Sequence, residues 1–250
     1  RQRQMCIRDR NYIDRYCEDG KLEYVIATHA HQDHIAAFGC TDGIFYSYSI
    51  GTIIDFPLTN SQTGTYRSYL SGRAYAIDRG AVHYSALDCW NENGDAKRTY
   101  ALGENITMEI LYNTYYETTT TNENDYSVCL LFTCGEQKFL LTGDLEEKGE
   151  KFLAENSRDA IQDCALFKAG HHGSYTSNSL TFMQAVRPEA VAVSCGLHND
   201  YGHPHRAALQ NYAEVGAEVW RTDLEGSLTF IWQNNTLNVE TSADSADFAA

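Results

Sequence analysis

Short apolar runs alternate with polar and amphipathic stretches along the chain, which is the pattern of an α/β protein. Apolar and β-branched runs predict strands over residues 22–28, 50–55, 106–112, 127–134, 137–142, 164–169, 190–195, 217–221 and 227–240. Helical spacing of apolar residues predicts helices near residues 34–40, 65–71, 145–156, 178–186 and 205–215. Residues 134–137 predict a hairpin turn, and Gly216 predicts the cap of the last helix. We expect helices flanking two mostly antiparallel sheets, a four-layer αββα sandwich.

Length and charge narrow the possible functions. The chain has 250 residues, of which 43% are hydrophobic, and this suits one large domain with a sizeable core. It has no apolar run of roughly 18 residues, so we expect no transmembrane segment. The net charge is −15, from 19 basic and 34 acidic residues. Because nucleic-acid binding normally uses a basic surface, long duplex DNA is a poor partner, and a small phosphoester or a short strand end fits better.

Seven of the nine histidines lie in three short segments. The first segment, residues 29–34, has the pattern H-x-H-x-D-H and follows the strand predicted at 22–28, where α/β folds place their chemistry. Side chains two apart on an extended chain point the same way, so His29 and His31 can hold one metal ion. Asp33 and His34 would face a second ion, and paired ions roughly 3.5–4 Å apart can assist hydrolysis. A histidine-rich surface loop is the alternative.

Other strand ends carry matching side chains. Asp144 follows the strand predicted at 137–142, where its carboxylate can bridge two cations or act as an ordinary turn or N-cap residue. His171 and His172 follow the next strand, and adjacent histidines on an extended chain diverge, so one can bind metal while the other faces substrate. In residues 201–205, Pro204 stiffens the backbone between two imidazoles.

Taken together, these motifs resemble the metallo-β-lactamase superfamily, and most closely the hydrolase domain of the bacterial competence protein ComEC and its stand-alone relatives. The shared patterns are H-x-H-x-D-H, N-x-x-S, L-T-G-D, G-H-H-G-S and Y-G-H-P-H, at residues 29–34, 124–127, 141–144, 170–174 and 201–205. The resemblance extends from about residue 22 to about residue 232. It implies the same αββα sandwich, and relatives carry one or two strands before the first motif that we expect to be missing here.

The resemblance also implies a set of metal ligands. His29 and His31 resemble the ligands of the first ion; Asp33, His34 and one histidine of the 171–172 pair resemble those of the second, with Asp144 as the bridge. We favour His172 as the ligand and His171 as a catalytic group that faces substrate. Many members have a further histidine where this chain has residues 124–127, so the first site would be under-coordinated or weaker, or Asp125 or water would complete it. We therefore expect one or two divalent ions, with Zn²⁺ preferred and Mn²⁺ as the alternative.

The expected activity is hydrolysis of a phosphodiester, either a nucleic-acid end or a small phosphoester such as a phosphorylcholine ester, by a metal-bound hydroxide. Asp33 would orient that hydroxide or accept its proton. His203, His205 and Ser174 would bind the anionic group or protonate the leaving oxygen, or else support the ligands. Asn124 and Tyr201 are candidate substrate contacts. The alternatives are hydrolysis of a carboxylic ester, lactone or amide, and an inactive metal-stabilised binding module.

Both ends of the chain differ from the rest. Residues 1–10 resemble the translated sequencing adapter found in metagenomic assemblies, and we interpret them as a non-native leader. We assign residues 11–240 to the hydrolase domain, shortened at its N-terminus, and residues 241–250 to a disordered tail. A bacterial source is expected, while export, cytoplasmic location and oligomeric state stay open.

Overall fold

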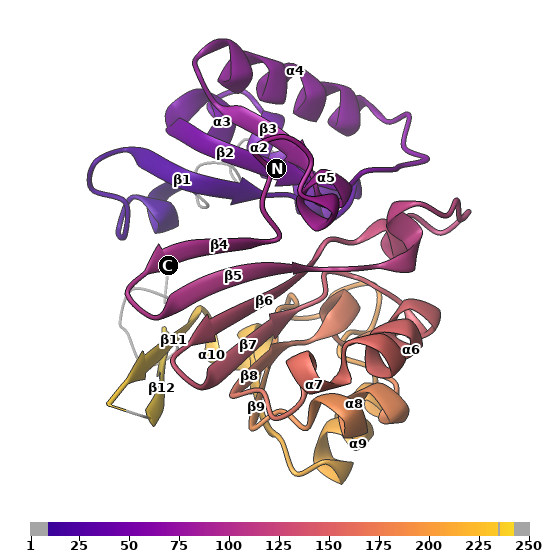
Figure 1. Cartoon of the computed structure of the whole chain (residues 1–250). Helices are drawn as coiled ribbons and strands as arrows, with labels where there is room; N and C mark the ends of the chain where they lie inside the picture. Colours follow the sequence, from indigo (N-terminus) through magenta and orange to yellow (C-terminus); the bar gives the residue numbers. More distant parts are fainter. Residues whose placement is uncertain (1–9, 235, 243–250) are drawn as a thin grey trace. The chain divides into compact units, whose positions relative to one another are not determined.

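The computed structural model describes residues 10–234 and 236–242, and these fall into two compact units. Unit 1 contains residues 10–98 and 114–128, and unit 2 contains 99–113 and the described residues from 129 onward. Each unit combines helices with a sheet, so the predicted mixed α/β class is confirmed (Figure 1). Among the described residues, no helix is long and apolar enough to cross a membrane.

Unit 1 is built on a sheet of three parallel strands in the order β1-β2-β3. The strands are β1 (Lys21–Ile26), β2 (Ser49–Asp55) and β3 (Val82–Ser85). The helical elements are α2 (Gln32–Gly39), α3 (Ile44–Ser47), α4 (Gly64–Asp78), α5 (Ala86–Asn91), η1 (Thr114–Tyr116) and η2 (Glu123–Tyr126). Helices α2 and α4 pack closely because Gly39 lacks a side chain: a Cβ there would lie 2.6 Å from the Cα of Tyr69.

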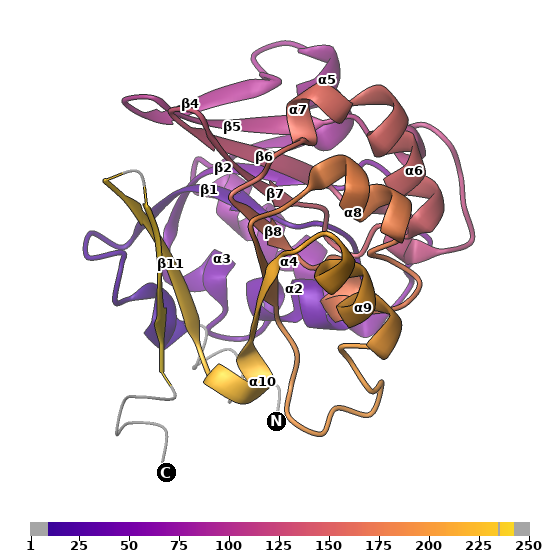
Figure 2. The same ribbon diagram turned by 90° about the horizontal axis from the view of Figure 1, so that it is seen from below.

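Unit 2 is built on a seven-stranded mixed sheet in the order β10-β9-β8-β7-β6-β5-β4. Its strands are β4 (Thr99–Gly103), β5 (Ile106–Leu111), β6 (Cys129–Cys134), β7 (Gln137–Leu141), β8 (Leu166–Lys168), β9 (Ala190–Val193) and β10 (Glu218–Arg221). Helical elements follow β7, namely α6 (Glu147–Asn156), α7 (Arg158–Ile161), η3 (Gly170–Gly173), α8 (Leu180–Val186), α9 (Arg206–Glu214) and α10 (Thr222–Glu225). Helices α6 to α9 gather along one side of the sheet, and a hairpin of β11 (Leu228–Gln233) and β12 (Thr236–Thr241) follows (Figure 2).

The expectation of mostly antiparallel sheets is wrong. Unit 1 pairs only parallel strands, and in unit 2 the strands from β7 to β10 are parallel, while those from β4 to β7 are antiparallel. The reason is the connections: helices return the chain between β7, β8, β9 and β10, and such crossovers place successive strands in the same direction. Within this sheet, β4 and β5 are joined by a short turn, as are β6 and β7, whereas residues 112–128 connect β5 to β6.

Several local predictions are confirmed and others are wrong. Cys134 pairs with Gln137 across a two-residue turn at Gly135, and Gly216 follows α9 with φ of 75°. The single strand predicted over 227–240 is instead a hairpin that turns near Asn234. Strands β3 and β4 and helices α3, α5, α7 and α10 were not predicted. The leader and tail assignments at 1–10 and 241–250 lie largely outside the described residues, and the four-layer arrangement stays a prediction.

Candidate metal centre

The first cluster of metal-binding side chains lies where β1 ends and α2 begins. The amide of Ala27 donates a hydrogen bond to the Ile54 carbonyl at 3.1 Å. The amide of Val128 donates one to the Thr28 carbonyl at 2.9 Å. These bonds hold the chain extended beyond β1. His31, with φ of −70° and ψ of 151°, is the N-cap of α2, and the first turn of α2 carries Asp33. The cluster therefore has the strand–loop–helix setting that the sequence predicts.

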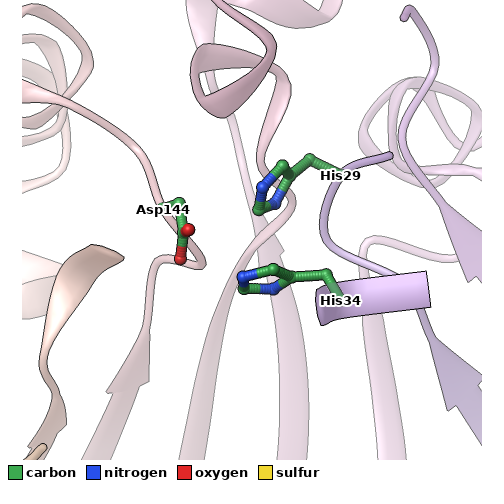
Figure 3. A group of neighbouring side chains, drawn as sticks. All are labelled: His29, His34 and Asp144. Carbon is green, nitrogen blue, oxygen red and sulfur yellow. The ribbon is translucent and has the colours of Figure 1, made fainter. Parts of the chain in front are cut away.

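The imidazoles of this cluster lie close together. His29 is fully buried, and its Nε2 lies 3.0 Å from Nδ1 of His31. Its Nδ1 lies 3.1 Å from the Thr28 hydroxyl, and the same hydroxyl lies 3.2 Å from Nδ1 of His34. The ring centroids of His29 and His34 are 4.2 Å apart, and Figure 3 shows one ring coming from the loop and the other from α2. Asp33 is exposed, with a carboxylate oxygen 3.6 Å from Nε2 of His34.

The spacing in unit 1 fits a metal ion. Two ligand atoms about 2.1 Å from a tetrahedral ion lie roughly 3.4 Å apart, close to the separation of the His29 and His31 nitrogens. The Thr28 hydroxyl beside Nδ1 of His29 can hold this ring by one nitrogen, as is usual for metal-binding histidines, and Nε2 lies beside the His31 nitrogen. The side chains present therefore suit a divalent transition metal.

A buried carboxylate that sequence reasoning missed supports this loop. Glu123 in η2 is 8% exposed, and it accepts hydrogen bonds from the Thr59 hydroxyl at 2.5 Å and the Asn60 amide at 2.8 Å. The amide of Ala30, between the first two histidines, donates to the same carboxylate at 3.4 Å. Its neighbour Asn124, predicted as a substrate contact, is also buried. A Thr- and Asn-rich sequence gave no sign that this segment would pack inside the unit.

The second cluster belongs to unit 2 and centres on Asp144, whose carboxylate is drawn in Figure 3. Strand β7 ends at Leu141, and Gly143 turns the chain with φ of 57°. Asp144 is only 2% exposed. Its Oδ2 lies 3.7 Å from Nε2 of His172 and 3.9 Å from Nε2 of His171. Both separations are longer than a hydrogen bond and resemble the spacing of ligands around one ion.

The expectation of an extended backbone at the histidine pair is wrong. His171 and His172 lie in η3 with φ of 46° and 54°, in the left-handed region that residues other than glycine rarely adopt. The amide of His171 donates to the Gly143 carbonyl at 3.1 Å, and the amide of Ser174 donates to the His171 carbonyl at 2.8 Å. This tight turn brings both Nε2 atoms towards the same carboxylate, whereas an extended chain would separate them.

His171 and His172 differ in the groups that lie beside their Nδ1 atoms. Nδ1 of His172 lies 2.8 Å from the Ser194 carbonyl, which can only accept, so this nitrogen carries the proton and Nε2 carries the lone pair. Nδ1 of His171 lies 3.2 Å from the Thr176 hydroxyl and 3.5 Å from a carboxylate oxygen of Glu146. A carboxylate beside an imidazole is a typical arrangement for a group that moves protons.

The third histidine segment lies beside this pair. The ring of His203 is 5.5 Å from that of His171 and 4.8 Å from that of His205. Burial and the neighbouring imidazoles lower the pKa of His203 to about 4. Nδ1 of His205 accepts a hydrogen bond from the Tyr175 amide at 3.1 Å, which leaves the proton on Nε2. Tyr201 is 78% exposed, whereas Ser174 is buried.

Two ionisable groups with shifted pKa values in unit 2, the half-buried Lys168 and the buried Glu150, were missed from the sequence. Burial lowers the pKa of Lys168, at the end of β8, while the Asp144 carboxylate acts in the opposite direction. Burial raises the pKa of Glu150, in α6, to about 7, although hydrogen bonds from the backbone of residues 178 and 179 oppose that rise. Neither residue lies in a histidine motif, so only the fold reveals them.

Comparison with known proteins gives partial matches. The chain is 33% identical to ComE operon protein 3 of Bacillus subtilis (strain 168) over 128 residues, which are 50% of this chain and 16% of that protein. It is 38% identical to competence protein ComA of Neisseria gonorrhoeae over 109 residues, 44% of this chain and 16% of that protein. A solved structure of a mutant CmlA β-hydroxylase aligns with 81% of this chain and 43% of its own, with 13% identity and a TM-score of 0.49. No family model matches.

These matches cover about a sixth of the length of each curated relative. Within that limit, the resemblance drawn from the motifs is confirmed: over about half of its length, the chain is similar in sequence to competence proteins of the ComEC type.

Proposed function

We propose that this chain is a metal-dependent hydrolase that cleaves a phosphodiester. The observation that carries the proposal is the buried carboxylate of Asp144, which faces Nε2 of His172 at 3.7 Å and Nε2 of His171 at 3.9 Å. A buried carboxylate is costly without a cation, and these ligand types select a divalent transition metal. Zn²⁺ is the first choice and Mn²⁺ the second.

The proposed ligands are those that the sequence motifs imply. His29 and His31 would hold one ion, Asp33, His34 and His172 would hold the other, and Asp144 would bridge the two. The proton on Nδ1 of His172 supports its choice as the ligand, since the lone pair of Nε2 is then available.

The remaining side chains have distinct proposed roles. A bound divalent ion supplies Lewis-acid polarisation and lowers the pKa of water towards about 7. Asp33, which is exposed beside His34, would orient the attacking water and accept its proton. His171, with Glu146 beside it, would face the substrate. His205 carries its proton on Nε2, so it can donate a hydrogen bond to a phosphoryl or leaving oxygen, and His203, Ser174 and Tyr201 would line the same region.

Metal titration together with a panel of substrates tests the proposal. The protein would be loaded with Zn²⁺ or Mn²⁺ and assayed on bis-p-nitrophenyl phosphate, p-nitrophenylphosphorylcholine, single-stranded DNA and nitrocefin. We expect turnover of a phosphodiester, lost on chelation. Asp33→Ala removes both the proposed base and a proposed ligand of the second ion, so it should weaken binding of that ion and lower the rate by at least roughly 10²–10⁴-fold, the range expected for loss of a general base. Asp144→Ala should lose both metal and activity.

The matched control is Asp78→Ala, which removes an exposed aspartate at the end of α4 and should change neither readout. Turnover of nitrocefin alone would contradict the phosphodiester assignment. Full metal loading without turnover of any substrate would favour a metal-stabilised binding module. Failure to bind either ion would defeat the proposal altogether.

A further inference from the structure

The histidine turn of unit 2 adopts a conformation that its own residues do not favour. His171 and His172 both have positive φ, and glycines at 170 and 173 flank them. Residues other than Gly, Asn and Asp rarely adopt this region, so surrounding groups must hold the turn in place. The hydrogen bonds of His171 with Gly143 and with Ser174 hold part of it, but they leave both polar backbone groups of Gly170 to be satisfied from elsewhere.

Asn178 satisfies those groups. It is fully buried, and its Oδ1 accepts a hydrogen bond from the Gly170 amide at 2.9 Å. Its Nδ2 donates to the Gly170 carbonyl at 2.9 Å and to the Ser174 carbonyl at 3.0 Å. One side chain therefore binds the backbone at both ends of the turn that carries the two histidines.

Glu150 in turn holds Asn178. This fully buried carboxylate on α6 accepts a hydrogen bond from the Asn178 amide at 2.5 Å and another from the Ser179 amide at 3.0 Å. From the opposite side, Nδ2 of Asn211 on α9 donates to the Asn178 carbonyl at 2.9 Å. Asn178 is thus anchored to two helices of unit 2, and neither anchor touches a candidate metal ligand.

Few residues can replace Asn178. The site requires an acceptor and two donor hydrogens on a short side chain, at a backbone position with φ of 61°. Asparagine meets all of these requirements and tolerates the left-handed region. Aspartate tolerates that region too but has no donor, and glycine has no side chain at all.

We propose that Asn178 is a positioning residue for the metal centre, and that Glu150 acts through it. By fixing the backbone of residues 170–174, Asn178 sets the directions in which His171 and His172 present Nε2 to Asp144. This inference rests on the proposed function for its catalytic meaning. The holding of the turn itself does not depend on metal.

The decisive variant is Asn178→Asp, which preserves size, backbone preference and the acceptor for Gly170, but replaces both donors with an oxygen that faces two carbonyls. Zn²⁺ affinity is measured by competition with a chromophoric chelator. We expect the Kd for Zn²⁺ to rise roughly 10–100-fold, as for other groups that orient metal ligands. The control is Asn156→Asp, which makes the same change where the side chain donates only to the Phe152 carbonyl on the exposed end of α6.

A second measurement uses the metal-free protein. Hydrogen exchange of peptides that cover residues 170–174 should be at least tenfold faster in Asn178→Asp than in the wild type or in Asn156→Asp. If the wild-type protein binds no Zn²⁺, the proposed function fails, and this measurement alone decides whether Asn178 holds the turn. Exchange at the wild-type rate overturns the inference, as does a Kd for Zn²⁺ within twofold of the control.

Glu150→Gln provides the second variant if Asn178→Asp does not fold. Glutamine retains one acceptor and places an NH₂ group against the other backbone amide, so Asn178 should loosen without losing its own hydrogen bonds. We expect a smaller effect in the same direction, about threefold or more in the Kd for Zn²⁺ and in exchange of residues 170–174. Wild-type values in this variant would remove Glu150 from the proposal.

Discussion

Two adjacent histidines, 171 and 172, turn their Nε2 atoms towards one buried carboxylate but differ at Nδ1. Because His172 donates from Nδ1 to the Ser194 carbonyl, its Nε2 is ready to bind a metal. His171 instead has a hydroxyl and the carboxylate of Glu146 near its Nδ1. We predict that His172→Ala weakens metal binding more than 100-fold. His171→Ala should keep the metal and lower kcat roughly 10²–10⁴-fold.

Metal titration and steady-state kinetics on each variant check this assignment. Glu146→Gln serves as an intermediate case, because it should leave metal affinity within about threefold of the wild type and reduce kcat less than His171→Ala does. Loss of metal in His171→Ala, with retention in His172→Ala, would reverse the two roles.

Functional residues could be predicted from the sequence where they belong to a recognisable motif. They could not be predicted where their importance depends on being buried in the fold. Histidines and aspartates at 29–34, 144 and 171–172 stand out because such clusters rarely arise by chance. Glu123, Glu150 and Asn178 do not stand out, since single acids and amides are common in loops and on helices. What makes them important is their loss of contact with water, which depends on residues far away in the sequence.

At the scale of elements, β5, β6, β7 and β9 were predictable from their apolar runs. Strand β9 is buried throughout, β5 and β6 are buried at half of their residues, and in β7 only Leu140 is buried. Strand β3, with the sequence Val-His-Tyr-Ser, is half-exposed, and only its pairing with β2 makes it a strand. Helix α4 continues to Asp78 past Gly72, where a predicted helix would be expected to end. The local pattern of apolar residues predicts an element poorly wherever tertiary packing decides whether the element forms and where it ends.

Helix α6 carries a prediction of its own, through Glu150. Burial raises the pKa of this carboxyl to about 7 from the ordinary 4.5, and Glu147 adds to the rise, so the folded protein holds the proton more tightly than the unfolded chain does. The stability gained from the proton is fully present below about pH 4.5 and is lost as the pH rises towards 7. The loss should amount to roughly 3 kcal/mol of unfolding free energy.

Urea unfolding of the metal-free protein at pH 5 and pH 8 measures this effect. Glu150→Gln cannot titrate, so its free energy of unfolding should change less between the two values than that of the wild type. An equal change in both proteins would show that Glu150 ionises normally in the folded state. Other carboxyls titrate in both proteins alike, so the difference between the two proteins isolates this group.

At the scale of the whole molecule, neither of the two units is one continuous segment of the chain. The chain leaves unit 1 after residue 98, returns for residues 114–128, and continues in unit 2 from residue 129. Residues 29–34 belong to one unit and residues 144, 171 and 172 to the other. The segment 11–240, predicted as a single hydrolase domain, therefore contains two compact parts, each with its own sheet and its own set of candidate metal ligands.

The charge of the whole molecule gives the last prediction. With 19 basic and 34 acidic residues, the chain has few cations with which to displace the counterions of a duplex. We therefore expect the metal-loaded protein to bind a duplex of about 40 base pairs no more tightly than the roughly 10⁻⁴–10⁻⁶ M typical of non-specific contacts. Its rate on bis-p-nitrophenyl phosphate should change less than about twofold between about 50 and 200 mM NaCl, because a small substrate spans few phosphates. Fluorescence anisotropy with labelled duplex and the colorimetric rate check both expectations. Submicromolar duplex binding that falls steeply with salt would instead require a basic surface that the composition does not supply.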